Sequence, residues 1–185
     1  MHLTRADHQK KVVRTLSAAQ VLNGVGVTGT VAAGSLLVAS ISNSEALAGL
    51  AQTTSVMGAA AMALPLAKLT QRGGRRLALS VGYGVGVVGA VLAILGGTHK
   101  ILFLMLAGAF LVGAASASGY QARFAAIDLA TPEHRSKNLS IVVWGSTVGA
   151  VTGPNLMQPS GNFAEFIGLP RLVGPYFIAA SSLML

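Results

Sequence analysis

The sequence contains few side chains that could carry out acid–base, nucleophilic or metal chemistry. Its 185 residues include no cysteine, which excludes a disulfide framework, thiolate metal sites and cysteine nucleophiles. The four histidines all lie near the N-terminus or in expected loops: His2, His8, His99 and His134. An intramembrane serine protease needs a base near its serine. The apolar part of the chain offers serines in GAASASG (113–119) and GSTVG (145–149), but no histidine or lysine lies in the apolar stretches that contain them. We therefore expect no enzyme, no cofactor and no metal site.

Two glycine motifs, GVGVTG at 24–29 and GVGVVG at 84–89, match the pattern G-x-G-x-x-G. A dinucleotide site requires a strand before this motif and a helix N-terminus at it. Both copies instead fall inside long apolar blocks. The alternative is close helix packing, because glycine lets two backbones approach each other. We favour packing.

The composition indicates a membrane protein. The chain is 52% hydrophobic and only 10% charged, whereas a soluble domain carries about 25% charged residues. The net charge of +8 could indicate nucleic-acid binding. However, the cations form short clusters between apolar blocks, and aromatic residues, at 5%, are too few for a stacking platform. We expect the partner to be the lipid bilayer and not nucleic acid.

The elements that must position any site are membrane-spanning helices. A spanning helix needs about 20 mostly apolar residues, and charge-free stretches predict spans at 15–44, 46–67, 77–98, 101–122 and 139–164. The fifth is expected to end near Met157, and a sixth begins at 172 but has only 14 residues before Leu185. Strands of a β-barrel would alternate in polarity. The expected fold class is an all-α integral membrane bundle with five complete spans and a truncated sixth.

The cations predict the orientation of these spans. Ten of the 13 lysines and arginines fall on one side: Arg5, Lys10, Lys11, Arg14, Lys68, Arg72, Arg75, Arg76, Arg135 and Lys137. Only Lys100 and Arg171 fall on the other. The positive-inside rule then gives a cell (inner) membrane protein with a cytoplasmic tail at 1–14 and a bundle at 15–185. A cleaved signal peptide is the alternative, but the first apolar stretch exceeds the about 7–15 residues of such a signal.

The cation-rich segment AKLTQRGGRR, residues 67–76, also carries a resemblance to a known family. It resembles the cytoplasmic signature G-x-L-A-D-R-x-G-R-R between helices two and three of major facilitator superfamily (MFS) transporters. Five residues stand where that signature requires them: Leu69, Arg72, Gly74, Arg75 and Arg76. Gln71 stands where the family has an acid, and in the family that acid helps to hold one gating conformation. Because Gln71 can form hydrogen bonds but carries no charge, it cannot form an ion pair at this position.

A second segment, DLATPEHR at 128–135, resembles the cytoplasmic signature at the end of helix four of the same family. An acid at a helix end near clustered arginines can form a charge network that breaks when helices separate. The resemblance implies a cytoplasmic gate that includes Asp128, Arg135, Arg75 and Arg76. The alternative is that Asp128 and Pro132 simply end a helix and solvate a loop.

A third segment, GSTVGAVTGP at 145–154, resembles the helix-five signature of the antiporter branch. Gly145, Gly149 and Gly153 recur every four residues and form a smooth stripe on one helix face. Pro154 removes a backbone hydrogen bond and allows a kink. The two glycines that continue the family's signature after the proline are absent from this sequence. In addition, Ala109 stands where the family has an arginine early in helix four. Both departures weaken the case for proton antiport.

Polar residues inside the apolar blocks are candidates for a substrate cavity: Gln20, Asn23, Thr28, Trp144 and Asn155. Asn23 is the strongest, because a membrane amide is costly without a partner or water. The alternative is that it bonds to another helix. Proton coupling normally uses a carboxylate at membrane depth. The expected spans contain no acid, and Asp128, near the cytoplasmic edge, is the candidate.

Arg123 has two interpretations. Its charge can snorkel to the cytoplasmic surface. Alternatively, it lines the inner vestibule, where it attracts an anionic substrate or pairs with Asp128, although a five-residue spacing is poor for same-face pairing.

The family has two six-helix bundles with the substrate between them, and the resemblance covers the N-terminal bundle. We expect a fragment that lacks the C-terminal bundle or receives it from a partner chain; the alternative is a natural half-transporter that dimerises. The expected function is secondary active transport that exports an unknown small molecule by alternating access. The alternative is a non-transporting membrane scaffold or assembly subunit.

Overall fold

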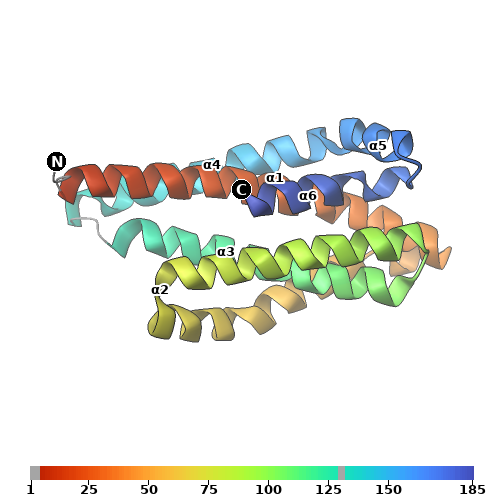
Figure 1. Cartoon of the computed structure of the whole chain (residues 1–185), viewed down its shortest axis with the longest axis horizontal. Helices are drawn as coiled ribbons and strands as arrows, with labels where there is room; N and C mark the ends of the chain where they lie inside the picture. The colour runs from red at the N-terminus through yellow and green to blue at the C-terminus, as the bar shows by residue number, and fades with distance from the viewer. Residues whose placement is uncertain (1–4, 129–131) are drawn as a thin grey trace.

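The computed structural model describes residues 5–128 and 132–185, and all regular structure within them is helical (Figure 1). The helices are α1 (Arg5–Ser42), α2 (Leu50–Thr98), α3 (Leu102–Asp128), α4 (Pro132–Asn155), α5 (Met157–Phe166) and α6 (Gly174–Met184). Short 3₁₀ turns at Glu45–Leu47 and Arg171–Val173 precede α2 and α6. The predicted all-α fold class is confirmed.

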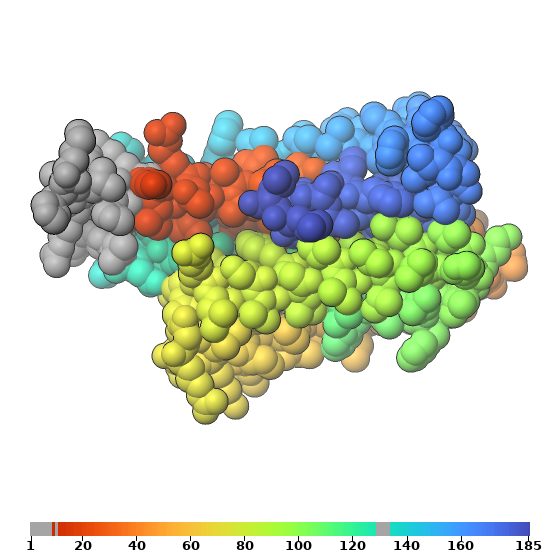
Figure 2. Space-filling model, in the orientation of Figure 1, coloured from red at the N-terminus to blue at the C-terminus, as the bar shows by residue number. Residues whose placement is uncertain are grey.

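The long helix α2 consists of two antiparallel arms that meet at Gly74. This residue has φ 81° and ψ 167°, a backbone conformation that is essentially restricted to glycine. The chain therefore reverses within the cation-rich segment, as the yellow part of Figure 1 shows, and each arm supplies one of the spans expected at 46–67 and 77–98. In Figure 2 the same turn forms a protruding lobe.

Three described segments are long and apolar enough to cross a membrane: Lys11–Ser42, Glu45–Thr98 and Leu102–Asp128. Because the second contains both arms of α2, they account for four of the expected spans. The expected fifth span is divided between α4 and α5, and α4 has many glycines, serines and threonines, which lower its hydropathy. α6 has 11 residues, fewer than the about 20 that a span requires. The chain is a multi-pass membrane protein.

The helix connections separate into two ends of the bundle (Figure 1). The start of α1, the turn at Gly74, the end of α3 and the start of α4 lie at one end, on the left of the view. The connections 43–49, 99–101 and 167–173 lie at the other. The two ends therefore separate the cation-rich segments from the segments that contain Lys100 and Arg171.

Small residues allow the helices to pack closely. The stripe on α4 consists of Gly145, Gly149 and Gly153, and all three face α1. A Cβ atom added to Gly149 would lie 2.7 Å from the Cα of Gly24, and one added to Gly145 would lie 2.8 Å from the carbonyl oxygen of Ser17. Any side chain on this stripe would therefore push α4 away from α1.

The two dinucleotide-like motifs have the same packing role. Gly24 and Gly29 face α4, and Gly26 faces α6, where an added Cβ would lie 3.2 Å from the Cα of Ala179. In the second motif, Gly86 and Gly89 face α3. No strand precedes either motif within the described residues, so the packing interpretation is confirmed.

Candidate functional site

An ion pair at the cation-rich end joins two helices that are distant in sequence. The Nε atom of Arg75 donates to Oδ2 of Asp128 over 2.6 Å, and its Nη2 donates to Oδ1 over 3.0 Å. Arg75 directly follows the turn at Gly74, and Asp128 is the last residue of α3. The side chains are 34% and 44% exposed. This bidentate pair fixes the α2 turn to the end of α3.

The other residues of the expected gate surround this pair. The side chains of Gln71, Arg72 and Arg76 are exposed on the same turn, and Arg135 is exposed near the start of α4. Residues 129–131 of the second signature lie outside the described residues. Within the described residues of the expected network, Arg75 lies against Asp128.

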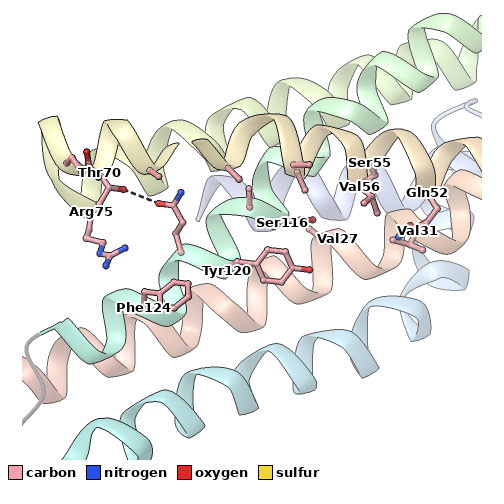
Figure 3. A pocket seen from close by; sticks show the side chains of 17 residues that line it. Val27, Val31, Gln52, Ser55, Val56, Thr70, Arg75, Ser116, Tyr120 and Phe124 are labelled. Atoms are coloured by element: carbon pink, nitrogen blue, oxygen red, sulfur yellow. Dashed lines mark hydrogen bonds between the residues drawn. The ribbon is translucent and has the colours of Figure 1, made fainter. Parts of the chain in front are cut away.

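A second link between α2 and α3 joins Thr70 and Gln121. Thr70 Oγ1 donates to Gln121 Oε1 over 3.0 Å (Figure 3). The carbonyl oxygen of Leu66, 2.9 Å away, shares the same hydroxyl hydrogen. The sequence analysis did not select either side chain. Thr70 interrupts an otherwise apolar run before the cations, but only the fold shows that it faces Gln121.

A groove of about 830 Å³ lies between α1, the first arm of α2 and α3 (Figure 3). Its floor is mainly apolar, with alanines of α2 and two aromatic residues of α3. The lining includes Val27, Ser116, Tyr120, Phe124, Gln71 and Arg75. Because Arg75 and Gln71 are part of this lining, the ion pair lies at the end of the groove that these two polar residues border.

A separate, polar cavity of about 290 Å³ lies between α1, α3 and α4. Four of the expected substrate-cavity residues line it together: Gln20, Asn23, Thr28 and Arg123. Val27, Ser116 and Tyr120 line both this cavity and the groove, so the two spaces adjoin. The fold thus gathers side chains from three helices around one space.

Two amides on α1 differ in how well their hydrogen bonds are satisfied. Gln20 is 1% exposed, and its Nε2 donates to the carbonyl oxygen of Gly119 over 2.6 Å. Asn23 is 9% exposed, and its buried Oδ1 accepts no hydrogen bond. Thr28 donates to its own helix, at Gly24, over 2.8 Å. Burying an unsatisfied amide oxygen is costly, so Asn23 is the less well satisfied of the two amides.

Arg123 points its guanidinium into the polar cavity and does not pair with Asp128, whose oxygens accept from Arg75. Its Nη2 donates to Ser146 Oγ over 3.4 Å, and its Cζ lies 5.1 Å from the ring centroid of Tyr120. Its Nε is buried and has no hydrogen-bond partner. The cation therefore has weak neutral contacts and an unused donor.

The remaining two cavity candidates lie elsewhere. Trp144 is 71% exposed and outside the polar cavity, because the neighbouring Gly145 occupies the helix face that packs on α1. Asn155 donates to the carbonyl oxygen of Val151 over 2.6 Å and borders a different cavity, near Arg171.

Tyr120 and Ser146 are functional candidates that the sequence analysis missed. Tyr120 precedes Arg123 by three positions and thus shares its helix face, a signal that the sequence did contain. Ser146 also donates to the carbonyl oxygen of Val143 over 2.6 Å, as serine side chains inside helices commonly do.

Comparison with known proteins adds independent information. The model of the Major Facilitator Superfamily matches residues 16–178. The chain is 36% identical over 176 residues to the uncharacterized MFS-type transporter YdeG of Bacillus subtilis (strain 168), covering 95% of the chain and 41% of YdeG. It is 34% identical over 179 residues to YddS of the same organism, covering 95% and 40%. It is 28% identical over 155 residues to the riboflavin transporter RfnT of Brucella anthropi, covering 84% and 39%. The chain thus spans about two fifths of the length of these relatives.

Proposed function

Because this chain belongs to the major facilitator superfamily, we propose that it forms one bundle of a secondary active transporter that works by alternating access. The relatives named above are called transporters. The polar cavity supplies part of the wall of the substrate site. A second bundle, from a longer protein or from a partner chain, supplies the opposite wall; the greater length of the relatives supports this arrangement.

The observation that carries the proposal is the bidentate pair between Arg75 and Asp128. The pair closes the turn of α2 against α3 at the cation-rich end, which the positive-inside rule assigns to the cytoplasm of a bacterial-type inner membrane. A bidentate ion pair at a helix end forms and breaks as a unit when helices move. Residues 1–14 are then the cytoplasmic tail, 15–185 the bundle, and the pair part of its cytoplasmic gate.

The proposed direction of transport is export of a small molecule. The support is the resemblance of GSTVGAVTGP to the antiporter branch, together with the close packing of its three glycines on α1. This packing allows α1 and α4 to move as one rigid pair, as a rocking bundle requires.

Cysteine labelling tests alternating access without knowledge of the substrate. The chain has no native cysteine, so Ala150→Cys places a single thiol on the polar cavity. A membrane-impermeant maleimide is applied to right-side-out and to inverted vesicles that contain the protein. We expect labelling from both sides, with a larger cytoplasmic share in Asp128→Asn. As a control, His99→Cys, exposed at the opposite end, should react from one side only.

Labelling of Ala150→Cys from one side only, unchanged by Asp128→Asn, would contradict alternating access. That result would favour the alternative of a non-transporting membrane scaffold.

A further inference from the structure

The charge balance of the polar cavity indicates what kind of substrate it can hold. Among the described residues that line it, Arg123 is the only charged side chain. Asp128, the nearest acid along α3, is engaged by Arg75 through both of its oxygens. The cavity therefore presents a positive charge without a counterion.

The surroundings of Arg123 leave that charge poorly satisfied. Its contact to Ser146 is long, at 3.4 Å, and its Nε is buried without an acceptor. A partly buried guanidinium is strongly stabilised by a carboxylate or phosphate, which accepts two parallel hydrogen bonds from its planar fork. Neutral hydroxyl groups do not offset the cost of removing the cation from water.

The neighbouring side chains define the rest of the ligand. Tyr120 is 56% exposed, and its ring lies against the guanidinium; the residue borders both the polar cavity and the adjoining groove. Aromatic faces bind planar and apolar groups. Asn23, whose buried Oδ1 accepts no hydrogen bond, also lines the cavity.

We propose that this cavity binds a small organic anion, with its acidic group on Arg123 and its planar or apolar body against Tyr120. This inference rests on the proposed transport function, because it names the substrate class of the same site. A cationic substrate would be repelled by Arg123. A neutral substrate would leave the guanidinium without a counterion.

A matched pair of probes tests the proposal. 2-Naphthoate and 2-naphthamide share one ring system and differ in charge, and their binding to the purified protein in detergent is measured by isothermal titration calorimetry. We expect the acid to bind at least about tenfold more tightly than the amide, as a charge-assisted bidentate contact allows. Arg123→Gln should remove this preference, so that the acid and the amide bind with similar affinity. Arg123→Lys should retain part of it, because lysine keeps the charge but not the fork.

Arg14→Gln is the matched control, because it removes an exposed arginine of α1 that lies outside the cavity. Circular dichroism establishes that each variant is folded. Equal binding of acid and amide, or a preference that survives in Arg123→Gln, would overturn the proposal. So would the absence of acid binding by the folded wild-type protein up to about 10 mM, a weak limit for a specific site.

The labelling of Ala150→Cys separates this proposal from the transport proposal. Two-sided labelling without anion preference would refute only the substrate class. Anion preference with one-sided labelling would refute transport by alternating access and leave the anion site standing.

Discussion

Breaking the ion pair between Arg75 and Asp128 should open the cytoplasmic side by an amount that follows from its geometry. The pair has two hydrogen bonds, of 2.6 and 3.0 Å, but its side chains are 34% and 44% exposed. Exposed pairs contribute about 0.2–1 kcal/mol, and bidentate geometry places this one near the upper limit of about 1 kcal/mol. Since about 1.4 kcal/mol corresponds to a factor of ten, the closed state should lose about fivefold in population.

A double-mutant cycle measures this effect. Asp128→Asn, Arg75→Gln and the double variant are each combined with Ala150→Cys, and the cytoplasmic and opposite labelling rates are compared. Each single substitution should raise the ratio of cytoplasmic to opposite labelling by about fivefold, and the double variant should add little, because either change alone removes the whole pair. High salt should reduce the effect, since solvent-exposed charges are screened.

Arg76→Gln is the matched control, because it removes the same charge from the adjacent, exposed position. It should change the labelling share much less than Arg75→Gln. If the single effects add fully in the double variant, or if Arg76→Gln equals Arg75→Gln, the specific pair does not close this end, and the argument from its geometry fails.

Three further predictions concern packing and backbone, and thermal unfolding in detergent checks each. Gly149→Leu should lower stability by about 1–3 kcal/mol, because the added side chain separates α4 from α1; an unchanged melting temperature would refute the close packing. Gly74→Ala should cost about 1–3 kcal/mol at its positive φ, whereas Gly84→Ala, with open space around it and a helical backbone, should gain about 0.5–1 kcal/mol. Gln20→Leu should cost about 0.5–1.5 kcal/mol by removing the buried bond to Gly119; a more stable variant would show that the bond contributes nothing.

The small residues explain how a chain with few polar groups can specify one arrangement. Apolar side chains gain little by moving from lipid to a helix interface, so contact distance decides which faces pair. Gly149 against Gly24 and Gly108 against Ala93 both bring backbones within reach. We infer that these stripes, more than any polar bond, fix which helices are neighbours.

The sequence by itself determined the membrane class, the positions of the apolar helices and the glycine face of α4. These properties are local, because hydropathy and the helical repeat depend only on nearby residues. The sequence also identified Gln20, Asn23 and Thr28, since polar side chains are conspicuous in an apolar span. It did not show that α2 would run through the expected loop and reverse at Gly74, because a single glycine φ angle depends on how the two arms pack.

Only the tertiary structure decided which of these residues meet. Several arginines were equivalent partners for Asp128 in the sequence, and the turn at Gly74 selected Arg75, 53 positions away along the chain. The structure likewise placed Arg123 beside Tyr120 and Ser146 and left Trp144 outside the polar cavity. Such pairings depend on the rotation of each helix about its own axis. That rotation is set by the packing of small residues from three different helices, which no single stretch of sequence contains.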